Sequence, residues 1–322
     1  MALTNFSVFS EYMYNSATET IAQQVELFNT ASRNTITLRS GSSDGDYSYD
    51  TMFAQVANMV SNRNAYGTGT FSPVALEQLQ TASVKIGGRT ELMEFSPSDF
   101  DWINQDPEQA GTAFGEQVAK GLLQYMLNSA LAATSAALSG VAALDYDGTA
   151  AVASLNSLQS AAGLFGDRAS AVAAWIMHSK SKTDIIGAAI TNANDLFEFG
   201  TVRITTDAEG RPLIVTDSPA LIDIDAGGAG IHHYHQLGLV TGAIMLQDNQ
   251  NYRLHENSDV TAENTKYFMK AEFDFNLGIK GFTWDTVTGV KSPSDAQLAT
   301  QTNWDQTATE VKDLCGVRST TL

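Results

Sequence analysis

A helical pattern of 33 residues, from Pro107 to Ser139, constrains the fold more than any other feature of the sequence. Asp106 can cap such a helix, Pro107 suits its first turn, and Glu108 complements its dipole. Apolar and small side chains then recur every three or four positions as far as Gly140, a typical C-terminal stop. At about 1.5 Å per residue the helix would be roughly 50 Å long, so we expect it to be a spine for the chain.

The size and composition of the chain predict a folded protein with more than one core. Of its 322 residues, 43% are hydrophobic and 17% are charged, which differs from the profile of disordered chains. Since single cores stop growing near about 250 to 300 residues, we expect two domains or one elaborated domain.

The charge balance and the single cysteine exclude several classes of protein. The chain has 36 acidic and 18 basic side chains and a formal net charge of −18, which disfavours a basic surface that grips nucleic acid. Cys315 is the only cysteine, so no intrachain disulfide can form and a reducing compartment fits. No histidine lies near Cys315 in the sequence, so a catalytic thiol has no support.

Neither a signal peptide nor a membrane span is expected. The opening residues, MALTNFSVFSEYMY, have no basic region and no continuous apolar core. The most apolar stretch, from Leu122 to Leu144, is interrupted by polar residues such as Gln124 and Asn128.

The segment from Arg33 to Phe95 has the pattern of a long two-stranded excursion. We expect a helix over 16–30 before it and strands over 35–39 and 83–86 within it, separated by a middle rich in Gly, Ser and Asn. Because the segment carries few apolar residues, it needs another surface, such as a neighbouring subunit, to become ordered.

The remaining elements are expected to mix helices and strands. We expect helical segments over 147–164, 167–177 and within 295–317, and strands over 201–205, 212–216, 238–246 and 267–277. The strands 201–205 and 212–216 should form an antiparallel hairpin. The strand 267–277 alternates apolar and mostly polar residues, so one of its faces should be buried.

The sequence contains few motifs that carry chemistry. It has no phosphate-binding Gly-rich loop and no G-x-S-x-G elbow. Seven acids without Lys or Arg lie between Thr90 and Ala119, and four more lie between Pro212 and Tyr252. These acidic runs have three interpretations. They are a paired-carboxylate active site, a solvated face, or an electrostatic surface that avoids DNA or meets a basic partner.

Five possible metal ligands lie within thirteen positions: Asp223, Asp225, His232, His233 and His235. A metal held there would make the chain a soluble metal-dependent enzyme. The spacing matches no helix-borne H-E-x-x-H pattern, and three glycines make the intervening loop pliable. The other interpretation is a polar loop that enters a strand.

Several strings of residues resemble the major capsid proteins of tailed bacteriophages, whose fold is typified by phage Hong Kong 97. Residues 81–133, TASVKIGGRTELMEFSPSDFDWINQDPEQAGTAFGEQVAKGLLQYMLNSALAA, are similar to the end of the extended loop and the spine helix of those proteins. Residues 174–186, AWIMHSKSKTDII, and 211–221, RPLIVTDSPAL, resemble pieces of the axial domain. Residues 292–317 resemble the tail of one subgroup.

The resemblance implies an α+β, Hong Kong 97-like capsid fold. The division that it implies is an N-terminal arm (1–33), an extended β-hairpin loop or E-loop (34–96), a peripheral domain (97–165) with the spine helix 107–139, an axial domain (166–250), return strands of the peripheral domain (251–290) and a C-terminal segment (291–322). In this family the arm and the E-loop pack on neighbouring subunits, which agrees with the few apolar residues between Arg33 and Phe95.

The resemblance also implies a structural function without catalysis or cofactor. The chain would self-assemble, as pentamers and hexamers, into the icosahedral shell that encloses a double-stranded DNA phage genome. Its other implied partners are a scaffolding protein on a separate chain, a portal and decoration proteins, with the DNA contacted weakly and non-specifically and no membrane. The implied location is the virion, assembled in the cytoplasm of the bacterial host. The alternatives are the metal-dependent enzyme and another virion structural protein, such as a tail or decoration protein.

Three cations are predicted to contact neighbouring subunits: Arg39, Lys85 and Arg89. Some members of the family cross-link subunits through a Lys in the E-loop and an Asn, and Lys85 is the only lysine before Lys120. Since that reaction also needs a buried carboxylate to take the proton, we favour a simple contact. We expect Lys85, Arg39 and Arg89 to meet an acidic strip on a neighbour, such as Glu91 to Asp106.

Overall fold

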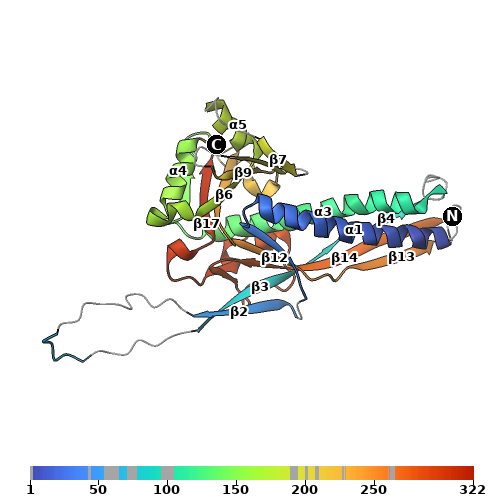
Figure 1. The fold of residues 1–322 in the computed structure, drawn as a ribbon, viewed down its shortest axis with the longest axis horizontal. Helices are drawn as coiled ribbons and strands as arrows, with labels where there is room; N and C mark the ends of the chain where they lie inside the picture. Colours follow the sequence, from blue (N-terminus) through green and yellow to red (C-terminus); the bar gives the residue numbers. More distant parts are fainter. Residues whose placement is uncertain are drawn as a thin grey trace.

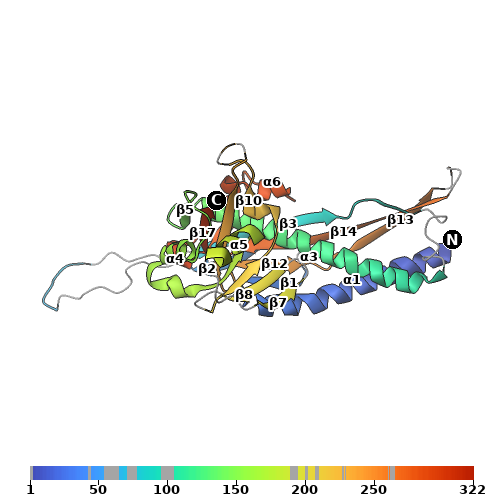
Figure 2. The same ribbon diagram turned by 90° about the horizontal axis from the view of Figure 1, so that it is seen from above.

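The computed structural model describes residues 3–42, 45–53, 65–70, 78–95, 105–188, 195–199, 202–206, 210–226, 228, 230–259, 261 and 265–322. The molecule is elongated. Two long helices and a sheet reach toward one end, a second sheet forms a separate lobe, and a hairpin leaves the body at the opposite end (Figures 1 and 2).

Helix α3 (Pro107–Ser139) is the predicted spine, with the predicted bounds. The side chain of Asp106 accepts a hydrogen bond from the amide of Gln109 at 3.1 Å, so the capping signal in the sequence has its expected structural role. The C-terminal half of α3 is buried almost continuously, which explains its Ala-rich composition.

Helix α1 (Leu3–Ala31) lies along α3 and runs in the same direction. It is longer than the predicted helix over 16–30 because its first half packs in a small cluster at the far end of the molecule. This cluster contains Phe9, Met13, Phe95, Ala110, Tyr267 and Met269. The ring of Phe9 meets that of Phe95 edge to face, with 5.8 Å between the ring centroids.

The first sheet lies beneath the two helices and has the long strand β14 (Lys266–Ile279) at its centre. Its strand order is β1 (Ile36–Ser40), β12 (Ile244–Asp248), β14, β3 (Gln78–Arg89) and β2 (Tyr47–Phe53), and β13 (Arg253–Asp259) and β4 (Met93–Phe95) pair with the outer part of β14. The alternation predicted over 267–277 is therefore a strand, and it extends beyond both predicted ends.

The second sheet forms the other lobe, with α4 (Leu155–Gly163) and α5 (Ser179–Ala188) beside it. Its order is β5 (Asp145–Gly148), β17 (Gly316–Thr321), β11 (His233–Val240), β6 (Val172–Met177), β9 (Pro212–Val215), β8 (Val202–Thr206) and β7 (Asp195–Phe199), and β10 (Ile222–Asp223) pairs with β11. Strands β8 and β9 are antiparallel, as predicted for the hairpin.

A third, two-stranded sheet pairs β15 (Phe282–Trp284) with β16 (Trp304–Gln306). The rings of Trp284 and Trp304 meet edge to face with their centroids 5.0 Å apart. One large apolar cluster runs through α3 and the sheets and joins the two lobes. None of the helices in the described part of the chain is both long and apolar enough to span a bilayer.

Four of the predicted segments after the spine helix are wrong in whole or in part. The helix predicted over 147–164 begins only at Leu155, after a cap by Ser154, because Asp147 and Gly148 belong to β5. The segment 167–177 is a short 3-10 turn, η1 (Gly166–Ala171), followed by strand β6. The apolar run of β6 fits a buried central strand as well as it fits a helix.

The predicted strand 238–246 is two strands in different sheets. Strand β11 ends at Val240, and β12 begins at Ile244 in the first sheet. Gly242 lies between them with φ +69, and its amide donates to the carbonyl of Asn34 at 2.7 Å. The chain thus turns from one sheet into the other at a residue that tolerates left-handed backbone.

The helix predicted within 295–317 is mostly absent. The structure has α6 (Asp295–Leu298), the 3-10 turns η3 (Gln301–Asn303) and η4 (Val311–Asp313), and strands β16 and β17. The indole of Trp304 donates to the carbonyl of Leu298 at 3.0 Å, so this side chain fastens a turn instead of lining a helix.

Candidate functional site: surfaces for assembly

Within the described residues, β2 and the outer part of the β2–β3 hairpin have little support from their own subunit. Among the described strands, β2 pairs only with β3, in register from Tyr47 opposite Val84 to Phe53 opposite Gln78. The pair leaves the body as a ribbon, and residues 65–70 lie far beyond it (Figure 1). Tyr49 is half-exposed and residues 65–70 are all exposed. A two-stranded ribbon is marginal alone, so this one needs a surface outside the subunit.

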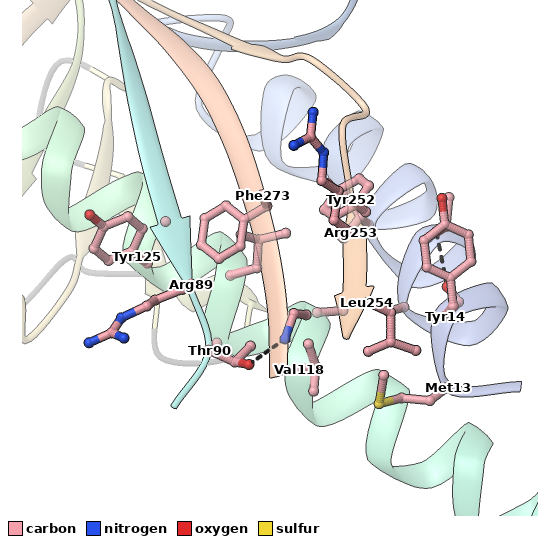
Figure 3. A pocket seen from close by; sticks show the side chains of 18 of the residues that line it. Met13, Tyr14, Arg89, Thr90, Val118, Tyr125, Tyr252, Arg253, Leu254 and Phe273 are labelled. Atoms are coloured by element: carbon pink, nitrogen blue, oxygen red, sulfur yellow. Dashed lines mark hydrogen bonds between the residues drawn. The ribbon is translucent and has the colours of Figure 1, made fainter. Parts of the chain in front are cut away.

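An apolar cavity of about 470 Å³ lies between the helices and the sheet beneath them. Figure 3 shows Met13 and Tyr14 of α1, Val118 and Tyr125 of α3, and Phe273 of β14 around it. The sequence does not predict a site at any of these residues. The alternation of apolar and polar residues in β14 was the only related signal in the sequence. It predicted which face of the strand is buried, but it did not predict the cavity.

The wall of this cavity depends on a glycine. Gly88 of β3 lies opposite Phe273 of β14, and a Cβ on Gly88 would come within 2.2 Å of the Phe273 ring. The ring therefore covers the backbone of Gly88. The Thr90 hydroxyl accepts from the amide of Ala271 at 2.9 Å and secures the end of β3 (Figure 3).

Lys85 has a partner within the subunit. Its ammonium lies 3.5 Å from a carboxylate oxygen of Asp274 on β14, and both side chains are largely covered. Asn276, directly opposite Lys85 in the sheet, bonds to Asn249 at 3.1 Å. The second carboxylate oxygen of Asp274 is buried without a partner in the described structure. This polar cluster faces a cavity of about 390 Å³.

Arg39 and Arg89 are placed differently from Lys85. Both side chains are exposed, at the ends of β1 and β3. Within the part of the chain that the structure describes, neither guanidinium has an ion pair. Arg89 lies across from Glu272, whose carboxylate is bound instead by Lys270 at 2.7 Å. The structure does not bring the three predicted cations together at one place.

The acidic run between Thr90 and Ala119 is not one continuous strip. The carboxylate of Glu94 pairs with Lys266 at 2.6 Å, and that of Asp106 caps α3. Glu91 is exposed. Asp99 and Asp101 lie outside the described residues.

Four of the five possible metal ligands form two separate pairs, and His233 lies opposite Asp223 where β10 pairs with β11. His235 is 2% exposed, and its Nε2 lies 2.9 Å from Asp223. His232 interacts with Asp225 in a loop, 3.9 Å between Nδ1 and Oδ1. No group of three or more His, Cys, Asp or Glu converges anywhere in the described residues. The interpretation of this segment as a metal centre is therefore not supported.

The surroundings of His235 also oppose a cation. The Arg318 guanidinium lies 3.1 Å from Nδ1, and the Thr320 hydroxyl lies at the same distance. The hydrogen bond with His235 lowers the pKa of Asp223, and burial raises the pKa of the nearby Asp145. The side chain of His235 on β11 thus forms hydrogen bonds with residues of β10 and β17 and holds the three strands together.

Cys315 is not an activated thiol. It is completely buried, and burial raises the pKa of its thiol to about 12. The nucleophilic thiolate is therefore scarce at neutral pH.

Comparison with solved structures identifies the class of fold. The chain matches "Cyanophage Pam1 capsid asymmetric unit" with a TM-score of 0.51 and 11% identity, over 89% of this chain and 88% of that chain. It matches "Microbacterium phage Oxtober96" with a TM-score of 0.51 and 10% identity, over 88% of this chain and 89% of that chain. No curated protein matches the sequence. The fold is that of phage capsid proteins, as the Hong Kong 97-like expectation required.

The family follows from the sequence itself. The model of the Gp13-like family, described as "Major capsid protein 13-like", matches residues 5–318, and the chain belongs to this family. It is thus a shell-forming capsid protein that assembles with copies of itself, and its role is structural. Neither the metal-dependent enzyme nor another type of virion protein is supported.

Proposed function

We propose that this chain forms an icosahedral shell of pentamers and hexamers around double-stranded DNA, in which the β2–β3 hairpin of each subunit lies on a neighbour. The proposed partners are a scaffolding protein on a separate chain, a portal and decoration proteins, with the DNA contacted weakly. Assembly takes place in the cytoplasm of the bacterial host, and the product is the virion.

The observation that carries this proposal is the unsupported hairpin. Strand β2 forms the edge of its sheet, with an exposed Tyr49 and a free outer edge among the described strands. Free strand edges and half-exposed aromatic side chains favour association. The excess of negative charge allows a shell to hold DNA without binding it tightly.

Negative-stain electron microscopy and light scattering on the purified chain, with and without a scaffolding protein, test the proposal. Closed shells with five-fold and six-fold clusters of subunits are expected. A monodisperse monomer under every condition, including with scaffold and crowding agents, would contradict the proposal.

Arg39 and Arg89 are proposed to contact a neighbouring subunit through their free charges. Arg39→Glu places the new charge opposite the neutral Gln247, so its effect on the fold should be small. Arg89→Gln avoids a second negative charge opposite Glu272. We expect each change to slow assembly measured by light scattering, whereas Arg39→Lys and Arg89→Lys, which keep the charge, should assemble normally. Unchanged assembly of both Arg39→Glu and Arg89→Gln would rule out these contacts.

A further inference from the structure

The apolar cavity between α1, α3 and the first sheet is a part of the core that the subunit leaves unfilled. Its volume of about 470 Å³ lies in the range of about 300–1,000 Å³ that is typical of sites that bury a ligand. Protein interiors are otherwise close-packed, so the side chains around a void of this size lack contacts on one side. An apolar group that enters the cavity would supply those contacts.

Two pairs of aromatic side chains flank the cavity (Figure 3). Tyr14 of α1 meets Tyr252 edge to face, with 6.3 Å between the ring centroids. Tyr125 of α3 meets Phe273 of β14 in the same way at 6.0 Å. Since aromatic rings pack well against one another edge to face or offset, these walls favour an aromatic side chain over an aliphatic one.

Polar groups at the solvent side of the lining favour a ring that carries a hydroxyl. Arg89, Glu91 and Arg253 line the cavity and are exposed. A buried tyrosine usually needs a hydrogen-bond partner for its hydroxyl, and the Glu91 carboxylate can accept such a bond. A guanidinium also interacts favourably with the face of an aromatic ring. Tyrosine is therefore the side chain that this cavity fits best.

The chain carries an exposed tyrosine at the far end of the β2–β3 hairpin. Tyr66 is 96% exposed, and it lies in the segment 65–70, Ala-Tyr-Gly-Thr-Gly-Thr, which is exposed throughout. The residues beside this ring in the sequence are small, so they do not obstruct its entry into a recess. An aromatic side chain buries about 150–250 Å² and dominates the energetics of the interfaces that it enters.

The exposed tyrosine and the cavity point toward opposite ends of the molecule. The hairpin leaves the body at one end, and α1, α3 and the sheet around the cavity reach toward the other (Figure 1). Contact between the projecting end of one copy and the receiving end of the next would be head to tail. Such contacts close into rings when the rotation between copies allows, which is the symmetry of the proposed pentamers and hexamers.

We infer that Tyr66 of one copy of this chain enters the apolar cavity of the next copy, where its ring packs between the two aromatic pairs. The inference rests on the proposed shell function and adds to it the place on the neighbour at which the hairpin docks. The other candidates for the cavity are a different segment of the chain and a small apolar molecule. In both of those cases, removal of the Tyr66 ring would leave assembly unchanged.

A pair of engineered cysteines tests the contact directly. Gly121 lines the cavity at an exposed position of α3 where a Cβ meets no atom within 4 Å, and Ala65→Cys leaves Tyr66 in place. We expect Ala65→Cys with Gly121→Cys to give disulfide-linked dimers and longer chains on non-reducing gels under mild oxidation. Ala65→Cys with Gly163→Cys, at an equally open position of α4, is the matched control and should not cross-link. The native Cys315 is completely buried, so it does not compete.

Blocking the cavity tests whether assembly depends on it. Gly121→Phe places a ring at the cavity from its own helix, and Gly163→Phe is the matched control on α4. We expect Gly121→Phe and Tyr66→Ala each to slow assembly, followed by light scattering, by about tenfold or more. Tyr66→Phe keeps the ring and should slow assembly by less than about threefold, and Gly163→Phe should assemble as the parent chain does. A thermal melt of each variant checks that the subunit is folded.

Cross-linking through Gly121→Cys but not through Gly163→Cys, together with slow assembly of Tyr66→Ala, supports the inference. Normal shells from Tyr66→Ala would overturn it and leave the shell function standing, whether or not Gly121→Phe assembles. Shells of the Ala65→Cys, Gly121→Cys chain that contain no disulfide would also overturn it. A parent chain that forms no shells, while the cysteine pair still cross-links, would refute the shell function and retain the contact. Absence of both shells and cross-links would refute both.

Discussion

Replacement of residues 54–77 by Asn-Gly is expected to abolish shell formation and leave the subunit folded. Phe53 and Gln78 are the last paired residues of the β2–β3 hairpin, and a two-residue Asn-Gly turn closes such a pair with the twist that antiparallel strands require. The shortened hairpin keeps every described pairing of β2 with β3. It removes only the part that is proposed to reach a neighbour.

Two measurements on the shortened chain separate assembly from folding. Sedimentation velocity and electron microscopy should show subunits or small oligomers where the parent chain forms shells. The thermal midpoint should stay within a few degrees of that of the parent chain, because residues 65–70, the described part of the removed segment, contribute nothing to the large apolar cluster. Shells of normal size from the shortened chain would show that this part of the hairpin is not an assembly element.

The spine helix could be predicted to the residue because its signals are local. Asp106, Pro107 and Gly140 mark its ends within a few positions of the chain, and the periodic pattern fills the space between them. The strand β14 was predictable for the same reason, since alternation within one segment defines its buried face. The spine helix also carried part of the resemblance to phage capsid proteins, through residues 81–133.

The missed elements depend on partners distant in the sequence. Strand β17 pairs with β11 and β5, and nothing within GVRSTT itself indicates that pairing. The break between β11 and β12 is fixed by the carbonyl of Asn34, more than two hundred residues away. Apolar runs such as that of β6 fit a helix or a strand until the neighbouring strands are known.

The surface residues also divide into those that local sequence signals predict and those that depend on partners distant in the sequence. The sequence predicts that the Arg33 to Phe95 segment needs an outside surface, and this stays a prediction, since β1 and β3 of the segment pair within the subunit and only the β2–β3 ribbon leaves the body. The intramolecular pairing of Lys85 with Asp274 could not be predicted, because it requires the register of β3 against β14.

Substituting alanine for both Gly111 and Gly115 is expected to destabilise the protein by separating α1 from α3. A Cβ on Gly111 would lie 2.5 Å from the carbonyl oxygen of Phe9, and one on Gly115 would lie 2.4 Å from that of Met13. Backbone atoms cannot rotate away as a side chain can, so α1 must shift as a whole. Overpacking lowers the free energy of unfolding by about 1–3 kcal/mol per site. The higher helix propensity of alanine offsets about 1 kcal/mol of this loss at each site.

Gly121→Ala is the matched control on the same helix, because a Cβ there meets no atom within 4 Å. We expect Gly121→Ala to raise the free energy of unfolding by about 0.5–1 kcal/mol and the double variant to lower it by up to about 4 kcal/mol, measured by urea denaturation. Hydrogen exchange should show the loss of protection first in α1. The C-terminal half of α3, away from Gly111 and Gly115, also packs on the part of the sheet that contains β12 and should stay protected. If the double variant were as stable as Gly121→Ala, the close contact of the two helices would not hold α1 in place. If α1 does loosen, the surface that it shares with Met13, Tyr14 and the apolar cavity changes as well, so the same variant should also assemble more slowly.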